Sequence, residues 1–278
     1  MSIHSRLGRF SVGFVACAIA GHAVAAQQIE IKTKAAEISV TVDDALKGYP
    51  GLVDNLLAEG RTWATKMRAD ADKDRKENPE SFQDDKKWSL ERSYTSRSVV
   101  GHYVSILRND YSFTGGAHPN TNIDTILWNA QARKRISIRP FFKETADNGP
   151  TLTALAKLVQ LAVVVEKATR LASQDDSKKD GGKKEPTPSP EDLLKDDSQV
   201  SEAIKPSLLK LGPVTLAPST VKGKSSGLTF HFSPYDVDAY AAGPYTVFVS
   251  WEAFKAYLSP EGAAIFGGER PETDTAEN

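Results

Sequence analysis

The sequence predicts an α+β fold in which antiparallel sheets pack against helices and the chain forms two linked subdomains. Runs with the two-residue alternation of strands occur in three groups, over residues 28–42, 88–138 and 214–250. Two long segments with the helical spacing of apolar residues, 50–68 and 151–172, separate these groups. With 278 residues, of which 40% are hydrophobic and 26% charged, the chain has the size and composition of one large or two ordinary domains.

The first 25 residues have the features of a cleavable signal peptide. Arg6 and Arg9 form a positive region, and Phe10–Ala20 is an apolar run too short to span a bilayer. Ala23–Ala25 supplies the small residues that signal peptidase recognises, so the mature chain is expected to start near Ala26. A buried N-terminal helix is the alternative. We expect an exported protein, periplasmic or secreted, with no transmembrane segment.

Cys17 is the only cysteine and lies inside this apolar run. Phe14–Cys17 is a distorted lipobox, because Phe14 occupies a place that usually holds leucine. Lipidation at Cys17 is therefore the less favoured alternative. With cleavage after Ala25, the mature chain has neither a disulfide nor a thiol nucleophile.

Bulk charge identifies no partner. The chain has 35 basic and 36 acidic residues, and loss of Arg6 and Arg9 leaves a net charge near −3. There is no positive field to attract nucleic acid.

The N-terminal subdomain is expected to begin with one or two strands over Gln28–Val42. A helix follows from Pro50, continues into a charged stretch that ends at Glu77, and is closed by Asn78 and Pro79. The next strands are expected at Trp88–Tyr94, Val99–Phe113, Ile123–Trp128 and Arg135–Ile138, with turns at Gly115–Gly116 and Asn129–Ala132 and a hydrophobic plug at Pro140–Phe142.

Thr151–Ala172 is the strongest helix prediction, because apolar residues recur at helical spacing after Pro150. Leu158–Val165 is apolar almost all the way round, so this helix is expected to be the most buried. Ser173–Pro190 is polar, with two glycines, four lysines and three prolines, and is expected to be a mobile insertion.

The C-terminal part is expected to contain short helical pieces around Leu193 and Ile204 and a polar, disordered tail at 269–278. The predicted strands are Val214–Ala217, Gly227–Phe232 and Tyr245–Ser250, with a turn at Pro234–Asp236 and a helix at Trp251–Leu258.

The turn within Tyr111–Asn120 is the most specified stretch of the chain. Gly115 and Gly116 permit positive φ, so the chain can reverse there. An exposed His118 can serve as a general base or a metal ligand. The alternative, which we favour, is that its imidazole bonds to nearby backbone and fixes the turn, because no second histidine lies at ligand spacing.

Catalytic patterns are sparse. His102 and His231 lie in strand-like runs and are interpreted as sheet histidines, and we expect no metal and no cofactor. Ser207 and Lys210 match a Ser-x-x-Lys pattern that is common by chance, and Pro206 before them indicates a short helix. A hydrolase using His118 or the Ser207/Lys210 pair is kept as the alternative function.

Aromatic residues gather around the two turns and can either bind sugar rings or a protein loop or form sheet core. They are Tyr111, Phe113, Trp128, Tyr235, Tyr240, Tyr245 and Trp251. The candidate binding residues are Tyr111, Gly115, Gly116, His118, Asn120, Tyr235 and Tyr240.

Two sets of residues carry a family resemblance. Thr114–Asn120 (Thr-Gly-Gly-Ala-His-Pro-Asn) after a Tyr-x-Phe strand, together with Ile138–Phe142, resembles the first of two linked extracytoplasmic domains. These occur in the ectodomain of the anti-sigma factor RsiV and beside PdaC-type peptidoglycan deacetylase domains. Leu228–Val237, followed by Tyr240–Gly243 and Val247–Trp251, resembles the second domain.

The resemblance covers residues 28–266 and divides the chain into a PdaC-like α+β subdomain at 26–148 and an RsiV C-terminal-like α+β subdomain at 149–268. It implies an envelope location and, from RsiV, lysozyme recognition. The chain lacks the cytoplasmic segment of an anti-sigma factor and the combined Asp-Asp and His-x-x-x-His motifs of a polysaccharide deacetylase. The function expected is therefore non-catalytic binding of a lysozyme-like protein or a cell-wall glycan.

Overall fold

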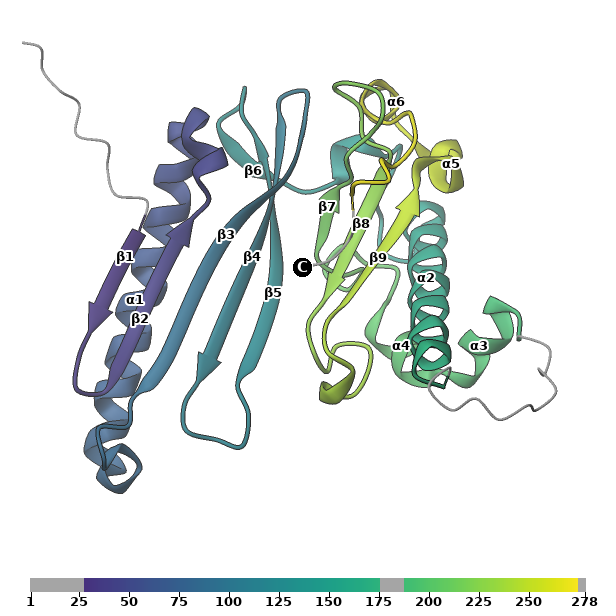
Figure 1. Ribbon diagram of the computed structural model, residues 1–278. Coiled ribbons are helices and arrows are strands. Elements are labelled where there is room, and N and C mark those ends of the chain that lie inside the picture. Colours follow the sequence, from purple (N-terminus) through teal and green to yellow (C-terminus); the bar gives the residue numbers. More distant parts are fainter. Residues whose placement is uncertain (1–27, 176–187, 275–278) are drawn as a thin grey trace, which may run out of the picture.

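The computed structural model describes residues 28–175 and 188–274, and these form two sheets with helices packed against them (Figure 1). The first sheet has six strands in the order β1-β2-β3-β4-β5-β6, and the second has three in the order β7-β8-β9. The predicted α+β class is confirmed. The predicted signal peptide, Cys17 and residues 176–187 of the predicted insertion lie outside the described residues.

The first sheet contains a parallel strand pair that the sequence did not predict. Its strands are β1 (Gln28–Lys32), β2 (Ala36–Val42), β3 (Trp88–Val100), β4 (Tyr103–Phe113), β5 (Asn120–Asn129) and β6 (Lys134–Ile136). Every neighbouring pair is antiparallel except β2 and β3. The long helix α1 (Pro50–Glu77) lies between these two strands in the chain, so the crossover returns the chain to the same end of the sheet.

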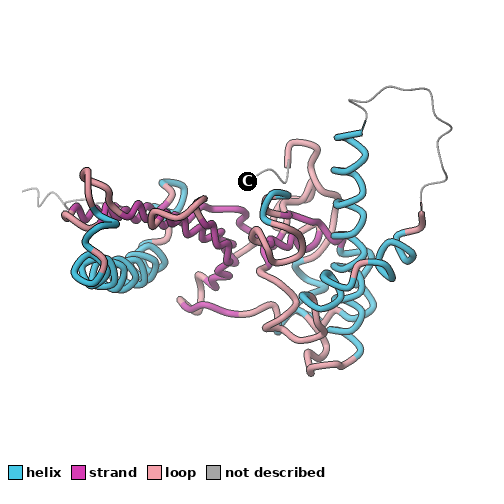
Figure 2. Tube along the Cα trace, turned by 90° about the horizontal axis from the view of Figure 1, so that it is seen from below, coloured by secondary structure: helices cyan, strands magenta, loops and turns pink. Residues whose placement is uncertain are grey.

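Helix α1 covers one face of this sheet, as the view along the strands shows (Figure 2). Its apolar residues Leu52, Leu56 and Leu57 are buried against the strands. Gly60 lets helix α1 approach β2 closely because it has no side chain. A Cβ at this position would lie only 2.6 Å from Cγ1 of Val40. The charged stretch continues the helix to Glu77 and faces water, where pairs such as Lys66–Asp70 are solvated.

The boundary between β3 and β4 differs from the prediction. The polar residues after Tyr94 were expected to end a strand, but β3 continues to Val100 through a register shift between Ser96 and Ser98. The chain reverses at Gly101 and His102 instead, with Gly101 at φ +59°. A bulge inserts one extra residue into a strand without ending it. It interrupts the two-residue alternation of side chains, so the alternation alone could not predict that β3 continues.

The second domain is built on helix α2 (Pro150–Asp175), which packs against β9 (Tyr245–Ser250) and shares its hydrophobic core with β8 (Gly227–Phe232). Strand β7 (Val214–Leu216) completes the sheet, and four short helices surround it: α3 (Pro190–Asp196), α4 (Ser198–Ala203), α5 (Trp251–Phe254) and α6 (Pro260–Ile265). Leu152, Leu155 and Val159 of α2 are fully buried. The apolar stretch 158–165 is not buried on every side, because Val165 is 43% exposed.

Side-chain hydroxyls of the first sheet fix the second domain against it. Strand β7 pairs with β8 along one edge, and its other edge faces the first sheet. The backbone N–H and C=O groups on that second edge form hydrogen bonds with side chains of the first sheet. The Leu216 amide donates to Ser105 Oγ at 3.1 Å, and the Leu216 carbonyl accepts from Ser98 Oγ at 2.5 Å. The Val214 amide donates to Thr125 Oγ1 at 2.9 Å. The two domains therefore share a hydrogen-bonded interface rather than a flexible link.

Two further segments complete the second domain. Phe141 and Phe142 are buried as the predicted plug, within a core shared with α2. Residues 269–274, assigned to a disordered tail by the sequence, instead pack on the second sheet: Arg270 lies 5.0 Å from the Phe248 ring centroid and pairs with Asp274 at 2.7 Å. Residues 275–278 lie outside the described part.

The Gly262→Ala variant should be measurably less stable. A Cβ at Gly262 would lie 2.0 Å from the Phe141 carbonyl oxygen, so α6 and the plug would have to separate. We expect a loss of about 1–3 kcal/mol in the free energy of unfolding, measured by urea denaturation. Gly48→Ala is the matched control, since nothing lies within 4 Å of its Cβ position. An equal loss in both variants would contradict the close approach.

No helix within residues 28–175 and 188–274 is long and apolar enough to cross a membrane.

Candidate functional site

The turn between β4 and β5 projects away from the sheet. Gly115 adopts φ +92°, and neither Gly115 nor Gly116 has an atom within 4 Å of its Cβ position. His118 is exposed, and its Nδ1 lies 2.9 Å from the Pro119 carbonyl oxygen. The imidazole therefore bonds to adjacent backbone, which is the structural role favoured by the sequence.

The loop between β8 and β9 presents two tyrosines. Asp236 accepts from the Ser233 amide at 2.7 Å and tightens the turn, while Tyr235 has φ +76° and is 58% exposed. Tyr240 begins a short 3₁₀ helix, Tyr240–Ala242, which Gly243 caps. A bulky residue in the left-handed region is uncommon, so the fold holds the Tyr235 ring outward at some conformational cost.

These two segments meet in space, although more than a hundred residues separate them in the chain. The rings of His118 and Tyr240 stack with centroids 3.9 Å apart, and the Tyr240 hydroxyl donates to the Pro119 carbonyl at 2.7 Å. Tyr235 lies 5.4 Å from Tyr240 and 6.4 Å from His118 between ring centroids. We call His118, Tyr235 and Tyr240 the junction cluster, because the two domains build it together.

A buried hydrogen bond fixes the loop beside the cluster. The Ile123 amide, on the part of β5 that β6 does not pair, donates to Ser233 Oγ at 2.9 Å. The edge of the first sheet is thereby attached to the residue that precedes the Pro-Tyr turn. The junction cluster is consequently held by rigid strands on both sides rather than by loop contacts alone.

The other candidate binding residues lie near this cluster without joining it. Tyr111 is half-buried on β4, opposite Glu91 of β3 and Thr121 of β5. It shares the face of β4 with Tyr103, whose ring belongs to the core of the second domain. Asn120 is exposed at the start of β5. Gly115 and Gly116 shape the turn through their backbone.

The residues of the hydrolase alternative are not brought together. Ser207 and Lys210 belong to a backbone turn in which the Lys210 amide donates to the Ser207 carbonyl at 2.9 Å. This turn borders β5 and β6 beside Leu209, whereas His118 contacts Tyr235 and Tyr240. Within the described ranges, no contact joins His118 to Ser207 or Lys210.

The three histidines of the described chain stay apart. His102 lies against the Tyr103 ring, and His231 is buried with its Nε2 3.0 Å from Thr215 Oγ1. Over residues 28–175 and 188–274, no group of three or more histidine, cysteine or acidic side chains is placed to hold a metal ion.

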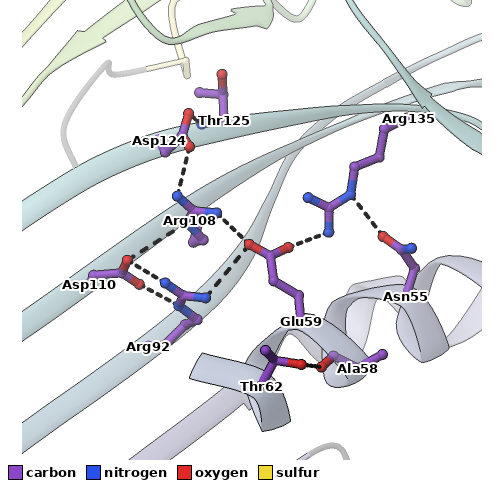
Figure 3. A network of polar contacts seen from close by, with 10 residues as sticks. All are labelled: Asn55, Ala58, Glu59, Thr62, Arg92, Arg108, Asp110, Asp124, Thr125 and Arg135. Carbon is purple, nitrogen blue, oxygen red and sulfur yellow. Dashed lines mark hydrogen bonds and ion pairs between the residues drawn. The ribbon is translucent and has the colours of Figure 1, made fainter. Parts of the chain in front are cut away.

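A network of six charges between α1 and the first sheet was not predicted (Figure 3). Glu59 of α1 accepts from Arg108 of β4 and Arg135 of β6, and lies 3.6 Å from Arg92 of β3. Asp110 binds Arg92 through two hydrogen bonds of 2.6 Å, and Asp124 binds Arg108 at 2.7 Å. Three arginines thus face three carboxylates. In the sequence each of these residues is an ordinary charged residue. Only the placement of the strand residues on one face of the sheet, opposite α1, could have indicated the network.

The electrostatics of this network are those of a structural element. Burial raises the pKa of Glu59, but Arg135 and Arg108 outweigh it and hold that pKa below its usual value. Burial and the Glu59 charge raise the pKa of Tyr94 to about 12, so this neighbouring phenol stays neutral. Arg92 is 7% exposed and stacks on Trp63. The network is balanced and fixes α1 on the sheet, and it leaves no charge directed at a ligand.

Two protein-family models match two separate segments of the chain. The family model described as deacetylase PdaC matches residues 26–121, and that of a protein of unknown function, DUF3298, matches residues 141–252. No curated protein matches.

Two solved structures of the DUF3298 family resemble the chain. One from Pseudomonas aeruginosa has 15% identity and a TM-score of 0.51, covering 87% of this chain and 94% of its own. One from Bacteroides fragilis has 16% identity and a TM-score of 0.47, covering 84% and 91%. At these identities the Pseudomonas protein shows a shared fold alone.

The junction cluster can be placed on this division. His118 belongs to the first matched segment, and Tyr235 and Tyr240 belong to the second. The chain therefore belongs to the proteins that carry a PdaC-family domain followed by a DUF3298 domain.

Proposed function

We propose that this chain is an exported, non-catalytic binding protein of the cell envelope, and that the junction cluster recognises its ligand. The ligand proposed is a peptidoglycan fragment or a lysozyme-like protein. Membership of these families supports an extracytoplasmic, envelope-related role. The arginines and small residues at the N-terminus support export by a cleavable signal peptide.

One observation carries the proposal. The junction cluster is a group of rings that both domains build, in which His118 and Tyr235 are exposed, Tyr235 to 58%, and Tyr240 is half-buried between them and the fold. Exposed, rigidly held aromatic rings offer apolar faces for sugar rings or for a protein loop, together with hydroxyl and imidazole groups at their edges. Tyr111 and Asn120 lie on the strands that flank the turn carrying His118 and are proposed as further ligand contacts.

Replacing Tyr235 should weaken binding without unfolding the protein. Asparagine tolerates the left-handed backbone that Tyr235 adopts, so Tyr235→Asn removes the ring at little conformational cost. We expect the affinity for the ligand to fall about tenfold or more, because exposed aromatic anchors dominate such surfaces. Calorimetry with the mature protein, against muropeptides and against c-type lysozyme in separate titrations, measures the loss and distinguishes the two ligands.

Leu209→Ser is the matched control, since Leu209 is 96% exposed and lies on a different loop. It should leave the affinity unchanged. The proposal fails if neither ligand binds the mature protein, or if both variants bind as the native chain does.

A further inference from the structure

A groove lies along the edge of β9 that pairs with no strand of the described chain, away from the junction cluster. It has a volume of about 1150 Å³. The sheet order β7-β8-β9 leaves β9 at an edge of the second sheet. Helix α2 forms one wall through Leu161, Ala162 and Val165, and residues 270–274 form the opposite wall. Figure 1 shows α2 running beside β9.

The register of the ladder shows which backbone groups face the groove. The Ala217 amide donates to the Gly227 carbonyl, and the His231 amide donates to the Pro213 carbonyl. These bonds direct the backbone of residues 227, 229 and 231 toward β7, so residues 228, 230 and 232 bond to β9. On β9 the partners of those three are Leu228–Val249, Phe230–Val247 and Phe232–Tyr245. The N–H and C=O of Phe248 therefore point outward, into the groove.

The two walls differ in chemistry. The α2 wall is apolar, and Val165 is 43% exposed there although it is a large aliphatic residue. The opposite wall and the groove end carry Glu272 and Glu191, which form no ion pair with a residue of the described chain. Each lining arginine has its own carboxylate, because Arg170 pairs with Glu166 at 2.8 Å and Arg270 with Asp274 at 2.7 Å. The lining thus has an excess of two negative charges.

We propose that this groove binds an extended polypeptide segment that adds a strand to β9 and alternates apolar with basic side chains. In a strand, successive side chains point to opposite faces. A segment paired with Phe248 would therefore place every second residue on the apolar α2 wall and the residues between them toward Glu272. Backbone bonds to the strand edge supply affinity, and the two walls supply sequence preference. This inference is independent of the function proposed for the junction cluster.

The test uses the mature full chain and a capped peptide of six residues, the length of β9, that alternates valine and lysine. Nuclear magnetic resonance titration should shift the Phe248 amide and saturate. A peptide that alternates valine and glutamate should bind at least about tenfold more weakly, because its negative charges are repelled by Glu272. A valine and lysine peptide that is N-methylated on the strand-facing residues should lose binding, because it cannot donate to the edge.

Protein variants separate the groove from non-specific charge attraction. Val165→Lys adds a bulky cation to the apolar wall and should lower the affinity for the valine and lysine peptide about tenfold. Val221→Lys makes the same change at a position that is 47% exposed elsewhere and should have no effect. Three results would overturn the proposal: equal binding of acidic and basic peptides, equal effects of the two variants, or full protection of the Phe248 amide from hydrogen exchange in the free protein.

Discussion

The Asp110→Asn variant is expected to lose about 3 kcal/mol of the free energy of unfolding. Asp110 holds Arg92 with two hydrogen bonds of 2.6 Å, and the Arg92 side chain is 7% exposed. Neutralising the carboxylate leaves a guanidinium buried without its main counter-charge, next to Arg108. Such a charge keeps its desolvation cost but loses the attraction that offset it. Urea denaturation at neutral pH measures the loss.

Asp124→Asn is the matched control within the same network. Arg108 is the only charged partner of Asp124, which also accepts from the Thr125 amide at 2.7 Å. The Asp124 side chain is 46% exposed, so water screens the ion pair and the loss should stay below about 1 kcal/mol. If the two variants were equally stable, burial would not govern the energetics of this network. That outcome would contradict the assignment of the six charges to a structural role.

Acidification is expected to destabilise the protein through His231, by about 3 kcal/mol between pH 7 and pH 4. Burial, as the larger cause, and the nearby charge of Arg97 together lower the pKa of His231 from its ordinary 6.5 to about 4, against an opposing effect of Asp274. In the unfolded chain this imidazole takes up a proton as pH falls through 6.5, whereas in the folded chain it stays neutral until about pH 4. The contribution of His231 to the free energy of unfolding is therefore fully present above pH 6.5, decreases as the pH falls below 6.5, and becomes constant below pH 4.

His231→Gln isolates this contribution, because glutamine does not titrate and can keep a bond to Thr215. The carboxylates with lowered pKa, which include Glu59 and Asp238, affect both proteins equally. The difference in unfolding free energy between the native chain and the variant should therefore change by about 3 kcal/mol between pH 7 and 4. A difference that is constant with pH would show that His231 is not held neutral. The ring signals of His231 give a second reading, since they should titrate near pH 4.

Local sequence patterns predicted most strands and helices correctly, because the periods of two and 3.6 residues are written into short segments. The strands at 120–129 and 245–250 and the helix at 150–175 follow from such patterns. The parallel pairing of β2 with β3 could not be predicted in this way, since it depends on where α1 returns the chain. The exposed side of α2 was missed for a similar reason, because Val165 faces a groove formed by residues 270–274.

The candidate site was predicted in pieces but not as a whole. The Gly-Gly turn and the Pro-Tyr turn were each recognisable from residues that favour chain reversal. Their meeting through His118 and Tyr240 depends on how the second domain docks on the first, through Ser98, Ser105 and Thr125. Hydroxyl side chains on strands carry no local signal for such an interface. The charge network was hidden in the same way, because Glu59 lies in a helix that reads as charged along much of its length.

The central claim is that the junction cluster contacts the ligand, and histidine ring signals test it most directly. After removal of the first 25 residues the chain keeps three histidines, His102, His118 and His231, so isotopic labelling gives three separate reporters. Titration of the labelled mature protein with a muropeptide or with c-type lysozyme should move the His118 signals and leave those of His102 and His231 in place. The Tyr235→Asn variant should remove that shift. A ligand that binds while His118 stays unchanged would contradict the account.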